Sequence, residues 1–456
     1  MKVRSHILEI HPALLLLGSF LGAIAIGTGL LALPVSTRTG TIALIDALFT
    51  ATSAVCVTGL AVVDTGSFFS AFGQLVILAL IQVGGLGVMT ISVMLFSLAG
   101  RAIPFRHRMI MQDVFAHTPR RDILKLVRSV VLVTLAVEGI GAILLAYHWS
   151  REMPLPQAIY HGVFHAVSAF CNAGFALYPD SLVRYADNAL LVLTMSGLIV
   201  IGGIGFPVLF DLGLALRARH RPQRRLAVQT KTVLITTAVL IGIGALMFAL
   251  LESHSAAGGE GWQTRVLTAL FQSITCRTAG FNTTDIAALR EATLVLMIFL
   301  MFVGASPGSC GGGVKTTTLA LIVMFTLSRI RKLRRVNMFR RSIPAETVTR
   351  CISLLLVSIG ILISIVFLLL VGDAIVAGSE VGPRHAFLPF FFETVSAFGT
   401  VGLSMGITPA LTLWGKLLII AMMILGRVGI LTFSYVVVGK AGTLGLEYAE
   451  ENLMIG

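Results

Sequence analysis

The sequence predicts an all-α polytopic membrane protein with four parallel helix–pore loop–helix repeats, eight spanning helices in all, around a pseudo-four-fold axis. Three observations predict this fold class. The 456 residues are 56% hydrophobic and only 12% charged, roughly half the charge of an ordinary soluble domain. One sequence pattern recurs four times along the chain, and the strongly basic segments fall between its copies.

Long uncharged runs predict the spanning helices. Each run has at least 20 residues, about what a helix needs to cross ~30 Å of hydrocarbon. The runs are Pro12–Thr37, Ala71–Gly100, Asn188–Phe210, Thr232–Leu251, Ala292–Val314 and Cys351–Gly372.

Basic residues predict the orientation. Most of them lie in segments 101–128, 217–231 and 329–341, with Lys2 and Arg4 at the N-terminus. By the positive-inside rule these segments face the cytoplasm. The net charge of +13 therefore indicates topology and membrane lipids as neighbours, not nucleic acid, because no soluble domain is visible to bind it. The five cysteines form no C-x-x-C pair, so neither a disulfide framework nor a zinc site is predicted.

The repeated pattern consists of the segments Phe49–Leu60, Phe164–Phe175, Phe271–Phe281 and Phe392–Leu403. A hydroxyl residue follows each Phe by four positions, and a Gly follows it by ten, or by nine in the third copy. The hydroxyl residues are Ser53, Ser168, Thr275 and Ser396. Four matching copies indicate four structural units.

Each unit has a long apolar helix, a short apolar segment that ends at the Gly, a polar turn and a second apolar helix. At 1.5 Å per residue the short segment cannot span the bilayer, so a re-entrant loop is predicted. The predicted repeats are 1–110 with a pore loop near 43–62, 111–222 with a pore loop near 156–177, 223–342 with a pore loop near 262–283, and 343–456 with a pore loop near 386–405.

The chain after each short helix is expected to be extended at membrane depth, where such backbone must line a water-filled path. Carbonyls of four such strands could replace the hydration shell of a monovalent cation, and Gly leaves room at the centre. The alternative is that each Gly only caps its helix. Four matching glycines after helices too short to cross favour a selectivity filter.

The residues at these positions carry a family resemblance. They are Val57-Thr58-Gly59, Asn172-Ala173-Gly174, Thr278-Ala279-Gly280 and Thr400-Val401-Gly402. With the four-unit organisation of the whole chain, they resemble the Trk/Ktr/HKT superfamily of potassium transport proteins, and within it the KtrB type of membrane subunit.

The resemblance implies a potassium filter centred on Gly59, Gly174, Gly280 and Gly402. It also implies potassium as the substrate, dependence on sodium (symport), a homodimer, and a cytoplasmic ring of KtrA-like RCK regulatory subunits that bind adenine nucleotides. The location it implies is the bacterial cytoplasmic (inner) membrane. The missing residue before Gly280 leaves open whether the third contribution is in register with the others.

Asp64, Asp180 and Asp285 follow the first three filter segments. Outside the membrane they could concentrate cations, or they could simply form turns and caps; both interpretations stay open.

Arg427 lies about 18 Å along the last helix, at mid-membrane depth. It is predicted to be a positive barrier beneath the filter, and the family places a matching Arg in the pore. The alternative is a buried ion pair with Glu138 or Glu393.

The second helix of the third unit is predicted to be broken across 303–318. Six residues there are Gly or Pro, which disfavour a helix: Gly304, Pro307, Gly308, Gly311, Gly312 and Gly313. A phosphate-loop interpretation fails because Lys315 comes one place too late for that motif. The resemblance implies that this break is an intramembrane gating loop that includes Lys315.

The milder motifs that begin at Gly84, Gly202 and Gly426 are predicted to be small-residue packing surfaces.

Two other functions fit the sequence less well than a channel-like pathway. A secondary cation transporter with alternating access often shows inverted repeats, whereas these are parallel. A membrane enzyme needs a nucleophile–base pair or a metal motif, but His161 and His165 lack the Glu of H-E-x-x-H. The sequence therefore predicts a potassium uptake pathway and no enzyme.

Overall fold

The computed structural model describes residues 12–87, 123–217, 226–253, 261–333, 335–376 and 387–429. Most of these residues are helical, so the all-α part of the prediction is confirmed for them. Two short strands, β1 (Asn337–Met338) and β2 (Arg341–Ser342), pair in an antiparallel hairpin. Lys2, Arg4 and most of the basic segments 101–128 and 217–231 lie outside the described residues.

The helices follow the chain in four groups. The first holds α2 (Pro12–Leu31), α3 (Leu44–Val55), α4 (Thr65–Phe68) and α5 (Ala71–Leu86), with the short turn η1 (Pro34–Ser36). The second holds α8 (Ile123–Trp149), α9 (Leu155–Phe170), α10 (Ala189–Ile204) and α11 (Phe206–Arg217), with η2 (Val183–Tyr185). The third holds α12 (Val228–Leu251), α13 (Trp262–Thr275), α14 (Glu291–Phe302) and α15 (Thr316–Ile330). The fourth holds α16 (Ala345–Val376), α17 (Phe387–Gly399) and α18 (Leu413–Val428), with η4 (Thr408–Ala410).

Polar side chains start three of the second helices, where the backbone N–H groups lack helical partners. Ser70 caps α5, Asn188 caps α10 and Thr412 caps α18, each through a hydrogen bond from the backbone N–H three residues on. In the first, second and fourth units, the polar turn predicted between the two halves thus supplies the helix start.

Three second helices end at a glycine with positive φ, which L side chains rarely adopt. Gly87 (φ 81°) follows α5, Gly205 (φ 98°) follows α10 and Gly429 (φ 90°) follows α18. The small-residue motifs therefore also mark helix ends.

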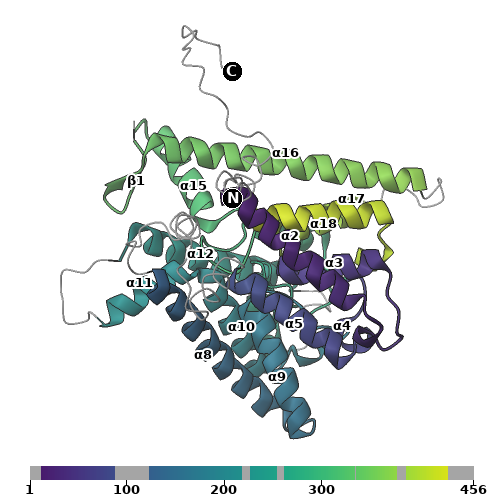
Figure 1. Ribbon diagram of the computed structural model, residues 1–456. Coiled ribbons are helices and arrows are strands. Elements are labelled where there is room, and N and C mark those ends of the chain that lie inside the picture. Colours follow the sequence, from purple (N-terminus) through teal and green to yellow (C-terminus); the bar gives the residue numbers. More distant parts are fainter. Residues whose placement is uncertain are drawn as a thin grey trace, which may run out of the picture.

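The packing within a group is the same in all four. The long first helix contacts the short second one: α2 with α3, α8 with α9, α12 with α13 and α16 with α17. Between groups, the helix after each short one contacts the short helix of the next group: α5 with α9, α10 with α13, α14 with α17 and α18 with α3. The contacts between groups thus close on themselves. In Figure 1, α16 lies along one edge of the molecule, and α8 and α9 lie toward the opposite edge.

Among the described residues, Arg128–Trp149, Val228–Leu251 and Ala345–Asp373 are long and apolar enough to cross a membrane. The run Asn188–Phe210 was predicted as one span, but Gly205 divides it into α10 and α11, which meet at 97°. As one broken span this pair would be the fourth candidate. Eight spanning helices therefore stay a prediction.

Candidate functional site

The four predicted filter segments, 57–59, 172–174, 278–280 and 400–402, share an unusual backbone. Each starts with a non-glycine residue at positive φ: Val57 (57°), Asn172 (57°), Thr278 (77°) and Thr400 (50°). The left-handed region costs such residues about 1–2 kcal/mol each, and strain of this kind concentrates at functional sites. The strain recurs at equivalent positions in all four units.

The glycines that end the segments also have positive φ: Gly59 (94°), Gly174 (70°), Gly280 (82°) and Gly402 (94°). Positive φ at every second residue departs from the backbone of an ordinary strand.

Each of these glycines lies against the filter segment of the next unit. A Cβ atom on Gly59 would come within 2.5 Å of the Ala173 carbonyl oxygen, and one on Gly174 within 2.9 Å of the Ala279 oxygen. A Cβ on Gly280 would clash with the Val401 oxygen, and one on Gly402 with the Thr58 oxygen. The contacts run from the first unit to the fourth and back to the first, so the four glycines form a closed ring without space for side chains.

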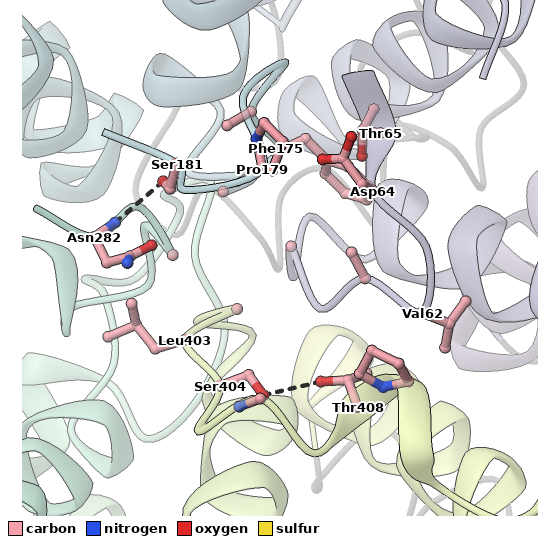
Figure 2. Close-up of a pocket in the computed structure, with 18 of the residues that line it drawn as sticks. Val62, Asp64, Thr65, Phe175, Pro179, Ser181, Asn282, Leu403, Ser404 and Thr408 are labelled. Atoms are coloured by element: carbon pink, nitrogen blue, oxygen red, sulfur yellow. Dashed lines mark hydrogen bonds between the residues drawn. The ribbon is translucent and has the colours of Figure 1, made fainter. Parts of the chain in front are cut away.

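All four glycines line one open cavity of about 330 Å³. Figure 2 shows this cavity, with labelled residues from all four units around it, among them Asp64, Ser181, Asn282 and Ser404. Ser181 Oγ accepts a hydrogen bond of 3.3 Å from the Asn282 backbone N–H, which joins units two and three at the rim. The cavity lies on the side of the ring reached by the chain after each glycine.

The repeated hydroxyl residues hold the filter segments. In units one and four the hydroxyl oxygen accepts from the glycine N–H: Gly59 N donates to Ser53 Oγ at 3.0 Å, and Gly402 N donates to Ser396 Oγ at 3.1 Å.

In units two and three the hydroxyl donates to the carbonyl just after the glycine. Ser168 Oγ donates to the Phe175 oxygen at 2.8 Å, and Thr275 Oγ1 donates to the Phe281 oxygen at 2.6 Å. These hydroxyl residues are recognisable in the sequence as part of the repeat. Their hydrogen bonds to the backbone at or just after the filter glycines are seen only in the structure.

The third unit is one residue shorter than the others between Thr275 and its filter segment, and a tighter turn compensates for the difference. In the first unit Thr58 N donates to the carbonyl of Ser53, five residues back, whereas Ala279 N donates to that of Thr275, four back, at 2.8 and 2.9 Å respectively. A Cβ on Gly280 would still lie 3.0 Å from the Gly174 Cα atom and 3.3 Å from that of Gly402. The third glycine therefore keeps its place in the ring.

The predicted helix break occupies residues 303–315 between α14 and α15, here called the central loop. Its ends meet at a bridge between Val303 and Val314. It packs on the second unit, where Ser306 N donates to Gly203 O at 3.1 Å and Phe206 N donates to Gly308 O at 3.0 Å.

The central loop also contacts the filter segments. Gly312 N donates to Thr400 Oγ1 at 2.8 Å, and Gly311 leaves no space for a Cβ beside Thr278 Oγ1. Thr278 and Thr400 are the first residues of their segments, so the loop lies at the end of the ring away from the cavity. Glycine is required here because the backbone approaches so closely.

Arg427 binds the central loop. Its guanidinium donates to the carbonyl oxygen of Cys310 in the loop and to that of Gly84 in the first unit. Lys315 Nζ donates to Gly311 O at 2.7 Å. Two cationic side chains thus hold carbonyls at the end of the ring opposite the cavity.

The alternative ion pairs of Arg427 are absent from the part of the chain that the structure describes. Glu138 accepts from Gln82 Nε2 at 3.2 Å, and Glu393 accepts from the Thr408 hydroxyl. Neither carboxylate lies within ion-pair distance of the arginine.

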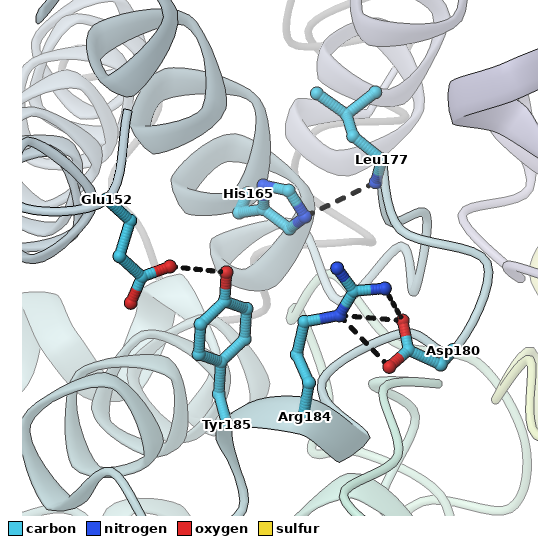
Figure 3. A network of polar contacts seen from close by, with 6 residues as sticks. All are labelled: Glu152, His165, Leu177, Asp180, Arg184 and Tyr185. Carbon is cyan, nitrogen blue, oxygen red and sulfur yellow. Dashed lines mark hydrogen bonds and ion pairs between the residues drawn. The ribbon is translucent and has the colours of Figure 1, made fainter. Parts of the chain in front are cut away.

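The three aspartates have different surroundings. Asp64 lines the cavity but also caps α4, where it accepts from Ser67 N at 2.7 Å. Asp180 pairs with Arg184 at 2.6 Å, and the hydrogen bonds from Arg184 hold the Asp180 pKa below its usual value (Figure 3). Asp285 accepts from Ala287 N at 3.0 Å in a turn.

One contact had no signal in the sequence. Lys416 Nζ of α18 lies 2.6 Å from Asp46 Oδ1 of α3, with both side chains largely buried. The pair joins the fourth unit to the first, and its members are too far apart in the chain for a motif to link them. His161 and His165 lie on α9 beside Trp149, and the described residues contain no group of three His, Cys, Asp or Glu side chains fit for a metal.

Comparisons with known proteins agree with this architecture. Residues 26–440 match the model of the TrkH family, described as a cation transport protein. The chain is 38% identical over 452 residues to the Ktr system potassium uptake protein B of Vibrio alginolyticus, across 98% of this chain and 95% of that protein. It is 39% identical to the protein of the same name from Bacillus subtilis over 427 residues, 93% of this chain and 92% of that one.

A third relative is the potassium/sodium uptake protein NtpJ of Enterococcus hirae, 36% identical over 453 residues and 98% of both chains. Among solved structures, the potassium transporter TrkH of Vibrio parahaemolyticus superposes with a TM-score of 0.68 over 92% of this chain and 84% of that chain, at 18% sequence identity. The fold is therefore that of a polytopic helical membrane protein. The family resemblance predicted from the sequence is confirmed, and the chain belongs to the TrkH family of cation transport proteins.

Proposed function

We propose that this chain takes up potassium across the bacterial cytoplasmic membrane through a channel-like pore with a backbone-carbonyl selectivity filter. The observation that carries the proposal is the closed ring of Gly59, Gly174, Gly280 and Gly402, each against a carbonyl of the next unit. The names of the Vibrio and Bacillus relatives, both potassium uptake proteins, support potassium as the substrate.

In this proposal the filter comprises residues 57–59, 172–174, 278–280 and 400–402. Their carbonyl oxygens would replace water around potassium. The four repeats would span 1–110, 111–222, 223–342 and 343–456, each with the same orientation in the membrane. The basic segments and the N-terminus would then face the cytoplasm, and the cavity of Figure 2 would be the extracellular vestibule.

The central loop is proposed as the gate. Its contacts with Thr278 and Thr400 support a position directly on the cytoplasmic side of the filter. Arg427 and Lys315 would add positive charge there, which a permeant cation must pass. Opening would require the Arg427 hydrogen bonds to Cys310 and Gly84 to break or move.

Control of the gate is proposed to come from a cytoplasmic partner. The relatives are named as members of a Ktr system, which supports a separate KtrA-like regulatory subunit that binds adenine nucleotides, with this chain as a homodimer. The name of the Enterococcus relative, a potassium/sodium uptake protein, supports a role for sodium.

Transport by the purified chain tests the proposal. Rubidium or potassium uptake into lipid vesicles that contain the protein is measured with and without sodium, and again with a Ktr-type regulatory subunit and ATP. We expect uptake that exceeds that of empty vesicles and rises with the partner. For the Arg427→Ala variant described next, Arg350→Ala is the matched control, because Arg350 pairs with Glu346 on the exposed surface of α16. No uptake above empty vesicles under any of these conditions would refute potassium transport.

The rate of ion flux and its coupling to a conformational cycle distinguish the proposed pore from an alternating-access transporter. A pore with a filter conducts rapidly and gives single-channel currents when the gate is open. An alternating-access transporter moves a fixed number of ions per conformational cycle. Strictly slow, coupled flux of the Arg427→Ala variant would favour the transporter.

A further inference from the structure

The residue directly after the repeated Phe is polar and buried in every unit. These residues are Thr50, His165, Gln272 and Glu393, with 2%, 0%, 0% and 0% of their surface exposed. A buried polar side chain is costly unless it has hydrogen-bond partners. Its recurrence at one position of the four short helices calls for a function.

In the second unit this residue binds the chain that leaves the filter. His165 Nε2 accepts a hydrogen bond of 3.3 Å from the backbone N–H of Leu177, as Figure 3 shows. The other ring nitrogen lies 2.8 Å from the carbonyl oxygen of His161. A carbonyl can only accept, so Nδ1 carries the proton and Nε2 is free to accept. Leu177 is the third residue after Gly174.

The third unit repeats the contact with different chemistry. Gln272 Nε2 lies 3.4 Å from Thr283 Oγ1, and Thr283 is the third residue after Gly280. In both units, therefore, the residue directly after the repeated Phe binds the third residue after the filter glycine. The segment that leaves each filter glycine is here called the exit strand.

In the fourth unit the exit is held through hydroxyls. Glu393 accepts from Thr408 Oγ1, and Thr408 Oγ1 lies 3.0 Å from Ser404 Oγ, the second residue after Gly402, as Figure 2 shows. Both hydroxyl residues line the cavity.

The first unit lacks this link. Thr50 Oγ1 donates to the Asp46 carbonyl of its own helix at 2.8 Å.

We propose that His165, Gln272 and Glu393 are positioning residues that fix the outer ends of their filter segments and thereby set the ion preference of the ring. The inference rests on the proposed function. The inner end of each segment is held by its short helix, and the glycine region by the repeated hydroxyl. The link to the exit strand is the third attachment.

Strained left-handed residues persist only where the surroundings over-determine them. Without the outer attachment, the strand can relax and the carbonyls can approach a smaller ion. Because selectivity depends on the size and field of the ring, sodium would then compete better with potassium.

The test uses the third unit, where both partners are side chains. Gln272→Leu, Thr283→Val and the double variant are reconstituted in vesicles, and the sodium concentration that halves rubidium uptake is measured. Each single variant is expected to lower it about 5-fold, the ratio that a hydrogen bond of about 1 kcal/mol produces. The double variant should lower it no further, because both changes remove one interaction.

Two variants serve as controls. Gln272→Glu can accept from the Thr283 hydroxyl, as the native Glu393 accepts from Thr408, so it should restore sodium resistance toward the wild-type value. Thr50→Val removes a hydroxyl that bonds only its own helix and should leave the ion preference unchanged. If Gln272→Leu does not reach the vesicles, Thr283→Val and Gln272→Glu decide the matter alone.

Unchanged sodium competition in both single variants, or additive effects in the double variant, would overturn the positioning role. A Gly59→Ser variant measured in parallel separates the two hypotheses. If Gly59→Ser alone weakens discrimination, the filter stands and the positioning role falls. If the wild-type protein shows no rubidium uptake, the proposed function itself falls.

Discussion

Replacement of Arg427 by Ala should open the pore in the absence of any partner. The side chain donates to the carbonyl oxygens of Cys310 and Gly84, and each hydrogen bond from a charged donor contributes about 1.5–3 kcal/mol. At the lower estimate the two hydrogen bonds together contribute about 3 kcal/mol, and the loss of both changes an equilibrium about 150-fold. A central loop that is open about 0.1% of the time would then be open about 10% of the time.

Rubidium uptake into vesicles without the regulatory subunit measures this effect, with the amount of reconstituted protein as the reference. Arg427→Lys separates the two contributions of the arginine. Lysine keeps the positive charge, but its single ammonium group cannot reproduce the planar fork of donors that reaches both carbonyls. If the hydrogen bonds hold the gate, Arg427→Lys behaves like Arg427→Ala; if charge alone is the barrier, it behaves like the wild type. An Arg427→Ala protein that reaches the vesicles in normal amounts and takes up rubidium no faster than the wild type would refute the reasoning.

Three further predictions concern the filter, the gate and the ion pair of Asp180 with Arg184. Gly59→Ser should weaken discrimination between potassium and sodium by about tenfold. The new Cβ would lie 2.5 Å from the Ala173 oxygen at a φ of 94°, and the resulting strain of about 1–2 kcal/mol must move a carbonyl. Equal relative uptake of the two ions before and after the change would contradict this prediction. Deletion of residues 309–313 should raise rubidium uptake and remove its dependence on the partner, because it removes the loop contacts with Thr400 and Arg427; a deleted protein that is present in the membrane but still needs the partner would place the gate elsewhere. Arg184 lowers the Asp180 pKa, so their pair stabilises the fold above the unfolded carboxyl pKa of about 3.9 and ceases to do so as the pH falls through the lower folded value. The melting temperature of Asp180→Asn should therefore lie below that of the wild type by a constant amount between about pH 5 and 7 and equal it in strong acid. A difference that persists in acid would exclude the ion pair as its cause.

Features that depend on local residue type could be predicted from the sequence. The repeat of Phe, hydroxyl and Gly is visible because each copy meets the same conformational demand, and the structure has positive φ at all four glycines. The interval 303–315 between α14 and α15 follows from six Gly and Pro residues that cannot sustain a helix. The apolar runs predicted helices, but not the 97° bend at Gly205, because a cluster of glycines such as Gly202, Gly203 and Gly205 also occurs in straight spanning helices, where it forms a packing surface.

Contacts between groups that are distant in the chain could be seen only in the folded molecule. The partners of Arg427 are backbone carbonyls, which every residue carries and no sequence pattern distinguishes. Charged residues do stand out in a sequence, which is why Glu138 and Glu393 were the alternative partners. The pair of Asp46 with Lys416 and the link of Gln272 to Thr283 join segments whose separation is set by the packing of helices. The register of Gly280 was also undecided in the sequence, because the turn after α13 could absorb the missing residue or pass it on to the ring. Local conformational preference is a property of each residue type, whereas the closure of the ring depends on how all four units pack together.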